Sequence, residues 1–415
     1  MSTPQPVAPL MSERRVAIIG GMLAAIGPIS MALYTPAMPE IVHAFGTTEA
    51  AVKLTLTAYF AGFALAQLVC GPLSDGFGRR TITFAFMAIY LVASIVALVS
   101  PNVEILIAAR FLQGVGAAVG VAISRAIVRD LFVHEQSARI MNLIGMILAI
   151  GPAFSPVIGG LVMEGFGWHA VFLLMIFFGL AIIYVTLFSL RETVQRDLTR
   201  IKPLAILRAY GTLLASRYFM YAALLIGCSI GTLYTLATML PFVLIDRAGL
   251  TATQFGLSML MQSGSFFAGS LTTRYNMPRF GSAGLVPIGL IFIAIGSIAI
   301  ATSVQIAEPS FYSIMFPVGV FTFGIAFVMP AMMTATLAPF PHIAGSAAAL
   351  SGFIQMGLGL VGGTIAMLIG DPIVAIGSVI PLMGFMAVVF WLLFRRLPEP
   401  ASAHRPTVSP PPSAV

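Results

Sequence analysis

The stretch "GPLSDGFGRR", residues 71 to 80, interrupts two long apolar segments of the chain. The 21 residues from Leu54 to Ser74 contain no charged side chain, and neither do the 23 residues from Thr81 to Val103. Each flank is long enough for a helix to cross a bilayer, which takes about 20 residues. The stretch itself holds an aspartate, three glycines and two arginines. This combination favours a tight polar turn between two membrane-spanning helices.

The composition of the whole chain indicates that its solvent is lipid. Of the 415 residues, 59% are hydrophobic and only 8% are charged, and the mean hydropathy is +1.01. Soluble globular proteins carry about 25% charged residues. We therefore expect an all-α membrane protein. The two cysteines, Cys70 and Cys228, lie inside apolar runs and suggest neither a disulfide framework nor a zinc site.

Charged residues mark where the chain leaves the bilayer, because a charge at the membrane centre is costly. The gaps between them predict twelve spans. The gap from 309 to 370 is long enough for two helices, and "PFPHIAG" (339–345) carries two prolines where a helix must break. The expected spans lie at residues 16–39, 54–74, 81–103, about 105–128, 140–163, 165–190, 218–245, 248–273 and 280–307, twice within 309–370, and at 372–394.

The basic residues predict the orientation of these spans. With the N-terminus inside, 17 of the 21 basic residues fall on the cytoplasmic side, in accordance with the positive-inside rule. Lys53 and Arg247 fall outside, while Arg110 and Arg125 lie within the fourth span. Contact with anionic lipid therefore explains the net charge of +7, and we exclude nucleic acid as a partner. Both termini are expected in the cytoplasm.

The chain divides into two sets of six spans. "GPLSDGFGRR" after the second span has an echo in "GSLTTRYNMPR", which begins at Gly269 after the eighth. Such a duplication predicts two pseudo-symmetric six-helix bundles, a transporter architecture with its substrate site between the halves. The expected units are disordered cytoplasmic tails at 1–13 and 397–415, bundles at 14–190 and 218–396, and a cytoplasmic linker at 191–217.

The stretch at 71–80 resembles the loop 2–3 signature of the major facilitator superfamily, Gly-x-Leu-x-Asp-x-x-Gly-Arg-Arg/Lys. The resemblance implies a latch that locks the cytoplasmic ends together when the protein is open to the outside. An aspartate at this place can accept hydrogen bonds from a helix N-terminus or pair with an arginine. The implied latch residues are Gly71, Asp75, Gly78, Arg79 and Arg80.

Further segments resemble the drug:proton antiporters of this superfamily. "RFLQGVGAAVG" (110–120) is similar to the fourth-span motif of proton-coupled members, and "GPAFSPVIGG" (151–160) to the fifth-span antiporter motif. "PISMALYTPAMPEI" (28–41) and "ISRAIVRDLF" (123–132) resemble the bicyclomycin/chloramphenicol-resistance group. The resemblance implies the bacterial inner membrane as location. It also implies a kinked fifth span between the halves, although ordinary small-residue packing would explain the same residues, which are Gly151, Pro152, Gly159 and Gly160.

The sequence departs from that group in the first span. The group carries an aspartate where this chain has Ala32, so Arg110 loses a plausible partner. An intramembrane carboxylate is the natural proton carrier, and a buried guanidinium needs compensation. Glu40 and Asp371 are the candidates for proton coupling with Arg110. Each also has a plainer interpretation: Glu40 as a solvated residue at the end of the span, and Asp371 as a turn residue before Pro372. Gln113, one helical turn from Arg110, could hydrogen-bond the guanidinium or a substrate.

Aromatic, methionine and glutamine residues on six of the spans are candidates for an apolar substrate cavity. Flexible and flat side chains suit varied lipophilic ligands. Each of them taken singly is also explained by helix packing or lipid contact. The set comprises Tyr34, Tyr59, Gln113, Tyr234, Phe242, Met261, Gln262, Phe266 and Gln355.

These features predict a transporter that exports small lipophilic or amphipathic drugs by alternating access, in exchange for protons. The alternative is a metabolite carrier or an uncoupled facilitator of the same superfamily, which Ala32 favours. An enzyme is not expected, because the five histidines lie at span ends or in a tail and no cluster of catalytic groups occurs in the sequence. We expect a monomer without cofactor or metal.

Overall fold

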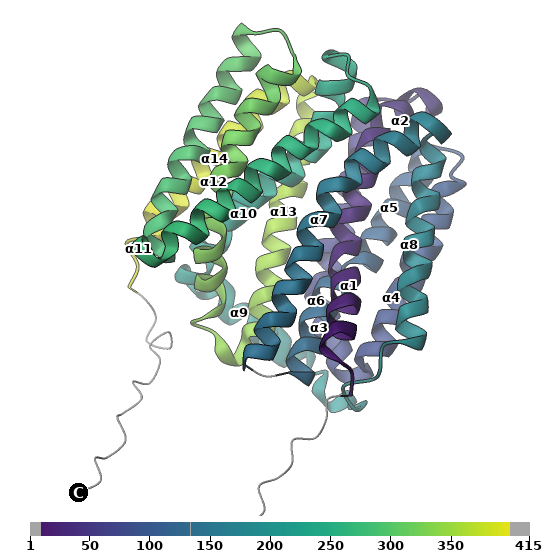
Figure 1. Cartoon of the computed structure of the whole chain (residues 1–415), viewed down its shortest axis with the longest axis vertical. Helices are drawn as coiled ribbons and strands as arrows, with labels where there is room; N and C mark the ends of the chain where they lie inside the picture. Colours follow the sequence, from purple (N-terminus) through teal and green to yellow (C-terminus); the bar gives the residue numbers. More distant parts are fainter. Residues whose placement is uncertain (1–9, 133, 399–415) are drawn as a thin grey trace, which may run out of the picture.

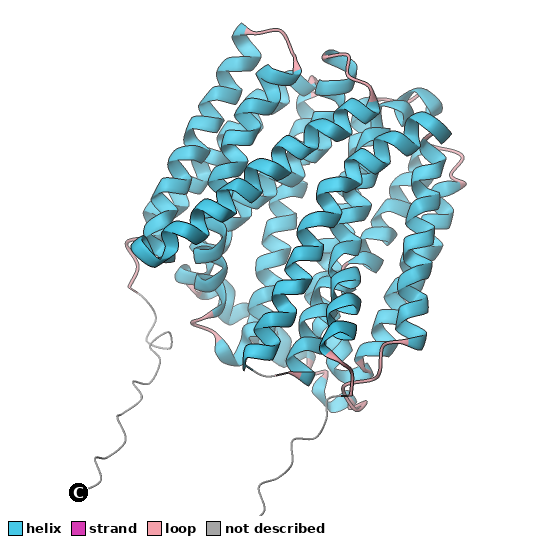
Figure 2. Ribbon diagram, in the orientation of Figure 1, coloured by secondary structure: helices cyan, strands magenta, loops and turns pink. Residues whose placement is uncertain are grey.

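Helices are the regular structure of this protein, as its apolar composition predicts. A computed structural model describes residues 10–132 and 134–398, and no strand occurs among them (Figure 2). Residues 1–9 and 399–415, which make up most of the two predicted disordered tails, lie outside the described part.

The first half of the chain forms six spans. A short 3-10 segment, η1 (Thr35–Ala37), interrupts the first span, because Pro36 and Pro39 cannot donate the backbone hydrogen bonds of a regular helix. The fourth span is also built of two helices, which meet at Ala118. The helices are α1 (Glu13–Tyr34), α2 (Met38–Phe45), α3 (Glu49–Phe77), α4 (Arg79–Leu98), α5 (Val103–Ala117), α6 (Val119–Leu131), α7 (His134–Phe166) and α8 (Trp168–Phe188).

The second half begins with a feature that the sequence analysis did not anticipate. The predicted linker contains a short turn, η2 (Leu198–Arg200), and a helix of 13 residues, α9 (Pro203–Ala215). The remaining elements are α10 (Arg217–Pro241), the π-helical turn η3 (Phe242–Arg247), α11 (Ala252–Ile306), α12 (Phe311–Leu337), η4 (Pro341–Ile343), α13 (Ala344–Ile369) and α14 (Pro372–Phe394).

The described chain crosses the membrane twelve times, as the sequence predicts. Eleven segments are long and apolar enough to span, and one of them, α11, has 55 residues. A straight helix of that length would measure about 80 Å, far more than the roughly 30 Å of a bilayer core. Gly281 breaks α11 with a φ of 68°, so that it supplies two crossings. The predicted break near residues 339–345 is confirmed by η4 between α12 and α13.

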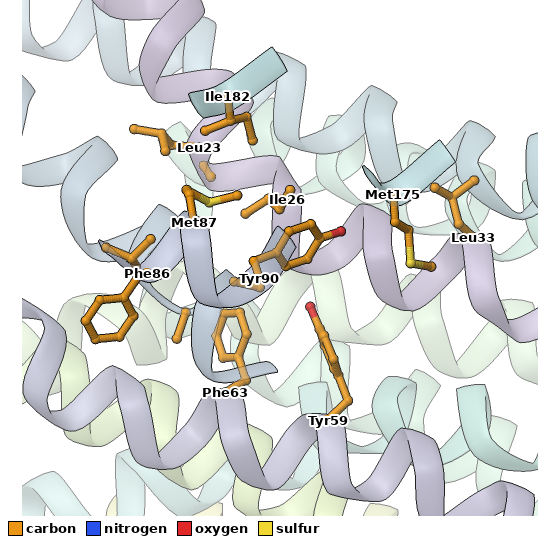
Figure 3. Close-up of a cluster of buried hydrophobic side chains, with 14 of the residues drawn as sticks. Leu23, Ile26, Leu33, Tyr59, Phe63, Phe86, Met87, Tyr90, Met175 and Ile182 are labelled. Carbon is orange, nitrogen blue, oxygen red and sulfur yellow. The ribbon is translucent and has the colours of Figure 1, made fainter. Parts of the chain in front are cut away.

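Each half of the chain surrounds a hydrophobic core of its own. One core gathers side chains from α1 to α8, among them Tyr59, Phe63, Tyr90 and Met175 (Figure 3), and Phe242 of η3 joins it from the second half. The other gathers side chains from α10 to α14. In Figure 1 the purple and blue helices of the first half stand beside the green and yellow helices of the second. The helix pairs α3–α13 and α7–α11 join the two halves.

Helix α9 covers one end of this assembly. The hydroxyl of Tyr210 donates a 2.6 Å hydrogen bond to the carbonyl of Leu68 in α3, and Leu213 is fully buried in a small cluster with α10 and α13. Burial raises the pKa of Tyr210 to about 12, so it remains a donor at neutral pH. We call the end that carries residues 71–80 and α9 the latch face. The opposite end, with turns at Gly46 and Gly370, is the far face.

Candidate functional site

The turn at residues 71–80 is built around one glycine. Gly78 ends α3 and precedes α4 with a φ of 99°, a backbone region in which side chains are strained. A Cβ there would also meet the Glu192 carboxylate, which follows α8. That carboxylate accepts hydrogen bonds from the backbone N–H groups of Arg79 at 2.7 Å and Arg80 at 3.1 Å. Glu192 thus caps α4 from another part of the chain, which sequence analysis missed because the two segments are distant in the sequence.

Arg79 is the centre of the latch. Its side chain is buried and pairs with Asp75 at 2.5 Å and with Asp130 of α6 at 3.0 Å. Its Nη1 also donates to the hydroxyl of Ser74 at 2.6 Å. Arg80 instead points to the end of α8 and donates to the Leu187 carbonyl. The latch therefore ties α3, α4, α6 and α8 together within the first half.

A cleft of about 560 Å³ opens between the two halves at the latch face. The latch residues Gly71, Asp75 and Arg79 line one wall, and the first turn of α13 lines another. The side chain of Asp75 is 43% exposed. Its carboxylate therefore pairs with Arg79 and is also open to the cleft. Five charged side chains line the cleft, four of them basic: Asp75, Arg79, Arg125, Arg129 and Lys202.

Arg110 is fully buried inside the first bundle, without a carboxylate partner among the described residues. Its guanidinium lies between the rings of Tyr34 and Tyr59, each 4.4 Å from the guanidinium carbon. Nη1 donates to Oε1 of Gln113, whose own amide donates to Ser94 at 2.7 Å. Within the described chain the Nε and Nη2 atoms have no acceptor. Cation–π contacts and one hydrogen bond thus take the place of the missing span-1 aspartate.

The predicted pairing of Arg110 with Glu40 or Asp371 is wrong in this structure. Glu40 is an exposed residue in the first turn of α2, whereas Arg110 faces the interior of the bundle. Asp371 caps α14 by accepting from the N–H groups of Ile373 and Val374 at 2.8 and 3.0 Å, and it lies 3.9 Å from Arg247. The bend at η1 and the turn before α14 place both carboxylates at the far face. Each carboxylate lies where its plainer interpretation places it, and neither contacts Arg110 in this structure.

The residues predicted to line a cavity fall into two groups. Tyr34, Tyr59 and Gln113 form the cage around Arg110 and are buried in the first bundle, because each is hydrogen-bonded to a neighbouring helix. The expectation that these three line an open cavity is wrong for this conformation. The others lie in the second half. The ring of Tyr234 lies 5.3 Å from that of Phe60 in the first half, at a tilted angle, and Phe242 is buried. Met261 and Phe266 pack against the second core, Gln262 is half-buried and Gln355 donates to Ser351.

The far face is closed by contacts between the halves. Lys53 was expected in an outer loop, but α3 begins at Glu49, so Lys53 lies in the second turn of that helix. Its ammonium is 2.9 Å from the Glu49 carboxylate and 4.7 Å from the centre of the Phe242 ring in the second half. The side chain is only 1% exposed. Asp246, beside Phe242 in η3, interacts electrostatically with both charges of this pair.

The fifth-span motif lies against both α1 and the second half. A Cβ at Gly159 would approach the Leu33 carbonyl to 2.4 Å, and one at Gly160 would approach the Ala252 carbonyl of α11 to 2.3 Å. Gly256 of α11 is equally close to Pro156 of α7. Nearby, Glu164 accepts from the backbone and hydroxyl of Thr253 at 2.8 and 2.7 Å. Gly151 and Pro152 lie about two turns earlier in α7, where a Cβ at Gly151 would lie 2.9 Å from the Ile29 side chain of α1.

This architecture matches a known family. A model of the Major Facilitator Superfamily matches residues 20–363. The chain belongs to this superfamily. The membership confirms the resemblance carried by residues 71–80, and it places the protein among multi-span membrane transporters. Its fold is similar to the crystal structure of a D-xylose-proton symporter, with a TM-score of 0.71 over 94% of this chain and 99% of that one at 14% identity.

Several relatives are similar over most of their length. An uncharacterized MFS-type transporter, YdgK of Bacillus subtilis, is 31% identical over 86% of this chain and 88% of its own. Multidrug resistance protein D of Escherichia coli is 26% identical over 89% and 93%. A chloramphenicol resistance protein of Pseudomonas aeruginosa is 28% identical over 79% and 77%.

Proposed function

We propose that this protein exports small lipophilic or amphipathic compounds from the cytoplasm of a bacterium by alternating access, in exchange for protons. The latch face is then cytoplasmic, as the basic loops predict, and both termini lie on that side. The observation that carries the proposal is the asymmetry between the two faces. A cleft separates the halves at the latch face, while α3 and α7 contact η3 and α11 at the far face. Two relatives named as resistance proteins support drugs as the substrates.

The conformational change exchanges these two sets of contacts. Opening the far face separates Lys53 from Phe242 and Glu164 from Thr253, which are contacts between the halves. Closing the latch face brings the exposed Asp75 towards the first turn of α13 on the other wall of the cleft. The N–H groups of that turn have no side-chain cap, so a carboxylate would stabilise them. The latch thereby favours the state that is closed to the cytoplasm.

The Glu49–Lys53 pair is the site at which we expect the outside proton to act. A buried ammonium without its carboxylate is strongly destabilised. Protonation of Glu49 from the outside would therefore leave Lys53 uncompensated beneath Phe242 and favour opening of the far face. This proton returns to the outside when the pair forms again, so the pair gates the far face and does not itself carry the exchanged proton inward. This assignment replaces Glu40 and Asp371 as the site of proton action and gives Arg110 a structural role.

Proton movement in proteoliposomes tests the proposal. Purified protein is reconstituted with an internal pH dye, and chloramphenicol is added stepwise. We expect drug-dependent proton flux that Glu49→Gln abolishes. Glu104→Gln, which alters an exposed carboxylate in the first turn of α5, should leave the flux unchanged. Drug transport without proton flux would overturn the exchange and identify an uncoupled facilitator. Flux that survives Glu49→Gln would refute the assignment of the proton site.

A further inference from the structure

Arg125 has no evident structural purpose in the described chain. It lies on α6, five residues before Asp130, and its exposed side chain lines the cleft between the halves. Among residues 10–132 and 134–398 its guanidinium forms no salt bridge or hydrogen bond. Arg79, by contrast, is held by Asp75 and Asp130. A cation inside a membrane span is costly and marks a functional site by default.

Orientation in the membrane does not explain a cation at this place. The positive-inside rule requires basic residues near the cytoplasmic ends of spans, but it does not require them to face one cleft. Lys202, ahead of α9, lines the same cleft, and it too has no partner in the described chain. The Nε atom of Arg129 lies 4.0 Å from the Asp130 carboxylate, which already pairs with Arg79 at 3.0 Å. The cleft therefore holds an excess of positive charge that the described residues do not neutralise.

The rest of the cleft is suited to the apolar part of an amphipathic ligand. Apolar side chains from three helices line it, among them Val121, Ile206 and Leu337. The uncapped first turn of α13 presents backbone N–H groups on the wall that contains Ala344 and Gly345, and these add a positive partial charge. In Figure 1, α6 and α9 lie in the lower half of the bundle, where α9 packs against α13 and the cleft separates both from α6. An apolar body and one anionic group would satisfy both kinds of surface.

We propose that the cleft is an entry site for amphipathic carboxylates and that Arg125 binds their carboxylate group. The inference rests on the proposed export function, because it names the class of substrate that enters from the latch face. Arginine suits this role, since its planar guanidinium can bind a carboxylate through two parallel hydrogen bonds. Lys202 supports the binding as a second positive charge across the same space.

Equilibrium binding to the full-length protein in phosphatidylcholine nanodiscs tests the inference. The probes are 11-(dansylamino)undecanoic acid and its methyl ester, which differ only in the anionic group. We expect the acid to bind about tenfold more tightly than the ester, as one charge-assisted hydrogen-bonded contact implies. Arg125→Gln should reduce the affinity for the acid to that for the ester and leave the ester unchanged. Arg125→Lys should retain part of the difference.

A matched control is Arg274→Gln, which removes an exposed basic residue of α11 that does not line the cleft. It should change neither affinity. Equal binding of acid and ester by the wild type would overturn the inference. So would an Arg125→Gln variant that weakens both probes equally. Because the ester reports on the same cleft without the charge, its unchanged binding also shows that the variant is folded.

A lipid headgroup is the other possible source of an anionic group. If phosphatidylglycerol in the nanodisc weakens binding of the acid to the wild type but not to Arg125→Gln, the cleft holds a lipid and the substrate assignment is overturned. Chloramphenicol, which carries no carboxylate, separates this inference from the proposed function. Export of chloramphenicol together with equal binding of the acid and the ester would support the proposed function and refute the inference. Preference for the acid without chloramphenicol export would support the inference and exclude chloramphenicol as a substrate.

Discussion

The Oε1 atom of Glu192 lies 2.7 Å from the backbone nitrogen of Arg79. Glu192 follows the sixth span, and it caps α4, the helix that forms the third span. Gly78 allows this approach, because any side chain there would collide with the carboxylate. The latch turn therefore depends on a residue outside its own motif.

Replacing Glu192 by alanine should destabilise the protein by about 1 kcal/mol, as loss of a helix cap does. The N–H groups of Arg79 and Arg80 would both lose their acceptor. Thermal unfolding in detergent measures the effect. Glu104→Ala, at an exposed helix start whose cap is Asn102, serves as the control and should shift the melting temperature much less. Equal shifts would mean that Glu192 does not act as a cap.

Alanine substitutions at two glycines of the same motif should change the free energy of unfolding in opposite directions. Gly78→Ala should cost roughly 1–3 kcal/mol, because its φ of 99° strains a side chain and Glu192 occupies the space. Gly71→Ala should stabilise α3 by about 0.5–1 kcal/mol, since nothing lies within 4 Å of its Cβ position and alanine favours a helix. Thermal unfolding of the two variants measures both effects. A destabilised Gly71→Ala variant would show that Gly71 has a role beyond its backbone.

The cage around Arg110 predicts strong coupling between Arg110 and Gln113. Gln113→Leu should cost about 2–3 kcal/mol, because Arg110 would lose its hydrogen-bond acceptor. Arg110→Met should cost less, because an apolar chain replaces a buried cation that has no carboxylate partner in the described chain. A double-mutant cycle followed by chemical or thermal unfolding measures the coupling. Additive effects of the two substitutions would contradict the cage.

The contact of α7 with α11 should tolerate no added methyl group. Gly160→Ala would place its Cβ 2.3 Å from the Ala252 carbonyl, which should keep the halves apart at the far face. We expect a cost of about 1–3 kcal/mol and loss of drug export. Gly165→Ala, on the same helix with nothing within 4 Å, should preserve export. Drug resistance of cells that express each variant at equal levels measures export. Equal resistance of the two variants would contradict the role of the Gly160 contact.

Much of the fold could be predicted because lipid imposes a simple rule. Each crossing needs about 20 apolar residues, and most charges lie at the ends of spans, so apolar runs revealed the twelve spans, including the fourth, which contains Arg110 and Arg125. The same rule predicted that Lys53 lies outside the spans, which is wrong. A lysine can lie inside a helix when a carboxylate one turn earlier compensates its charge. It also passed over α9, a helix too short to span whose buried face depends on contacts with α10 and α13.

The candidate site was less accessible to sequence reasoning. The motif at 71–80 identified the latch, but its partners Glu192 and Asp130 come from other spans. The spacing of Gln113, one turn from Arg110, predicted a hydrogen bond that the structure confirms, whereas the two aromatic rings that enclose the guanidinium were not expected as its partners. The sequence placed Arg125 within the fourth span, but it could not show that this side chain faces a cleft, because facing a cleft is a property of the packed helices.

The sequence by itself determined the class of the protein, the number of its spans and its superfamily. These follow from local properties: apolar length, the positions of charges and the spacing of turn residues. Only the tertiary structure decided which charges are paired, which aromatic residues are core and which face of the assembly is open. Such outcomes depend on contacts between residues that lie far apart in the chain, and helix packing sets these contacts at the scale of single atoms.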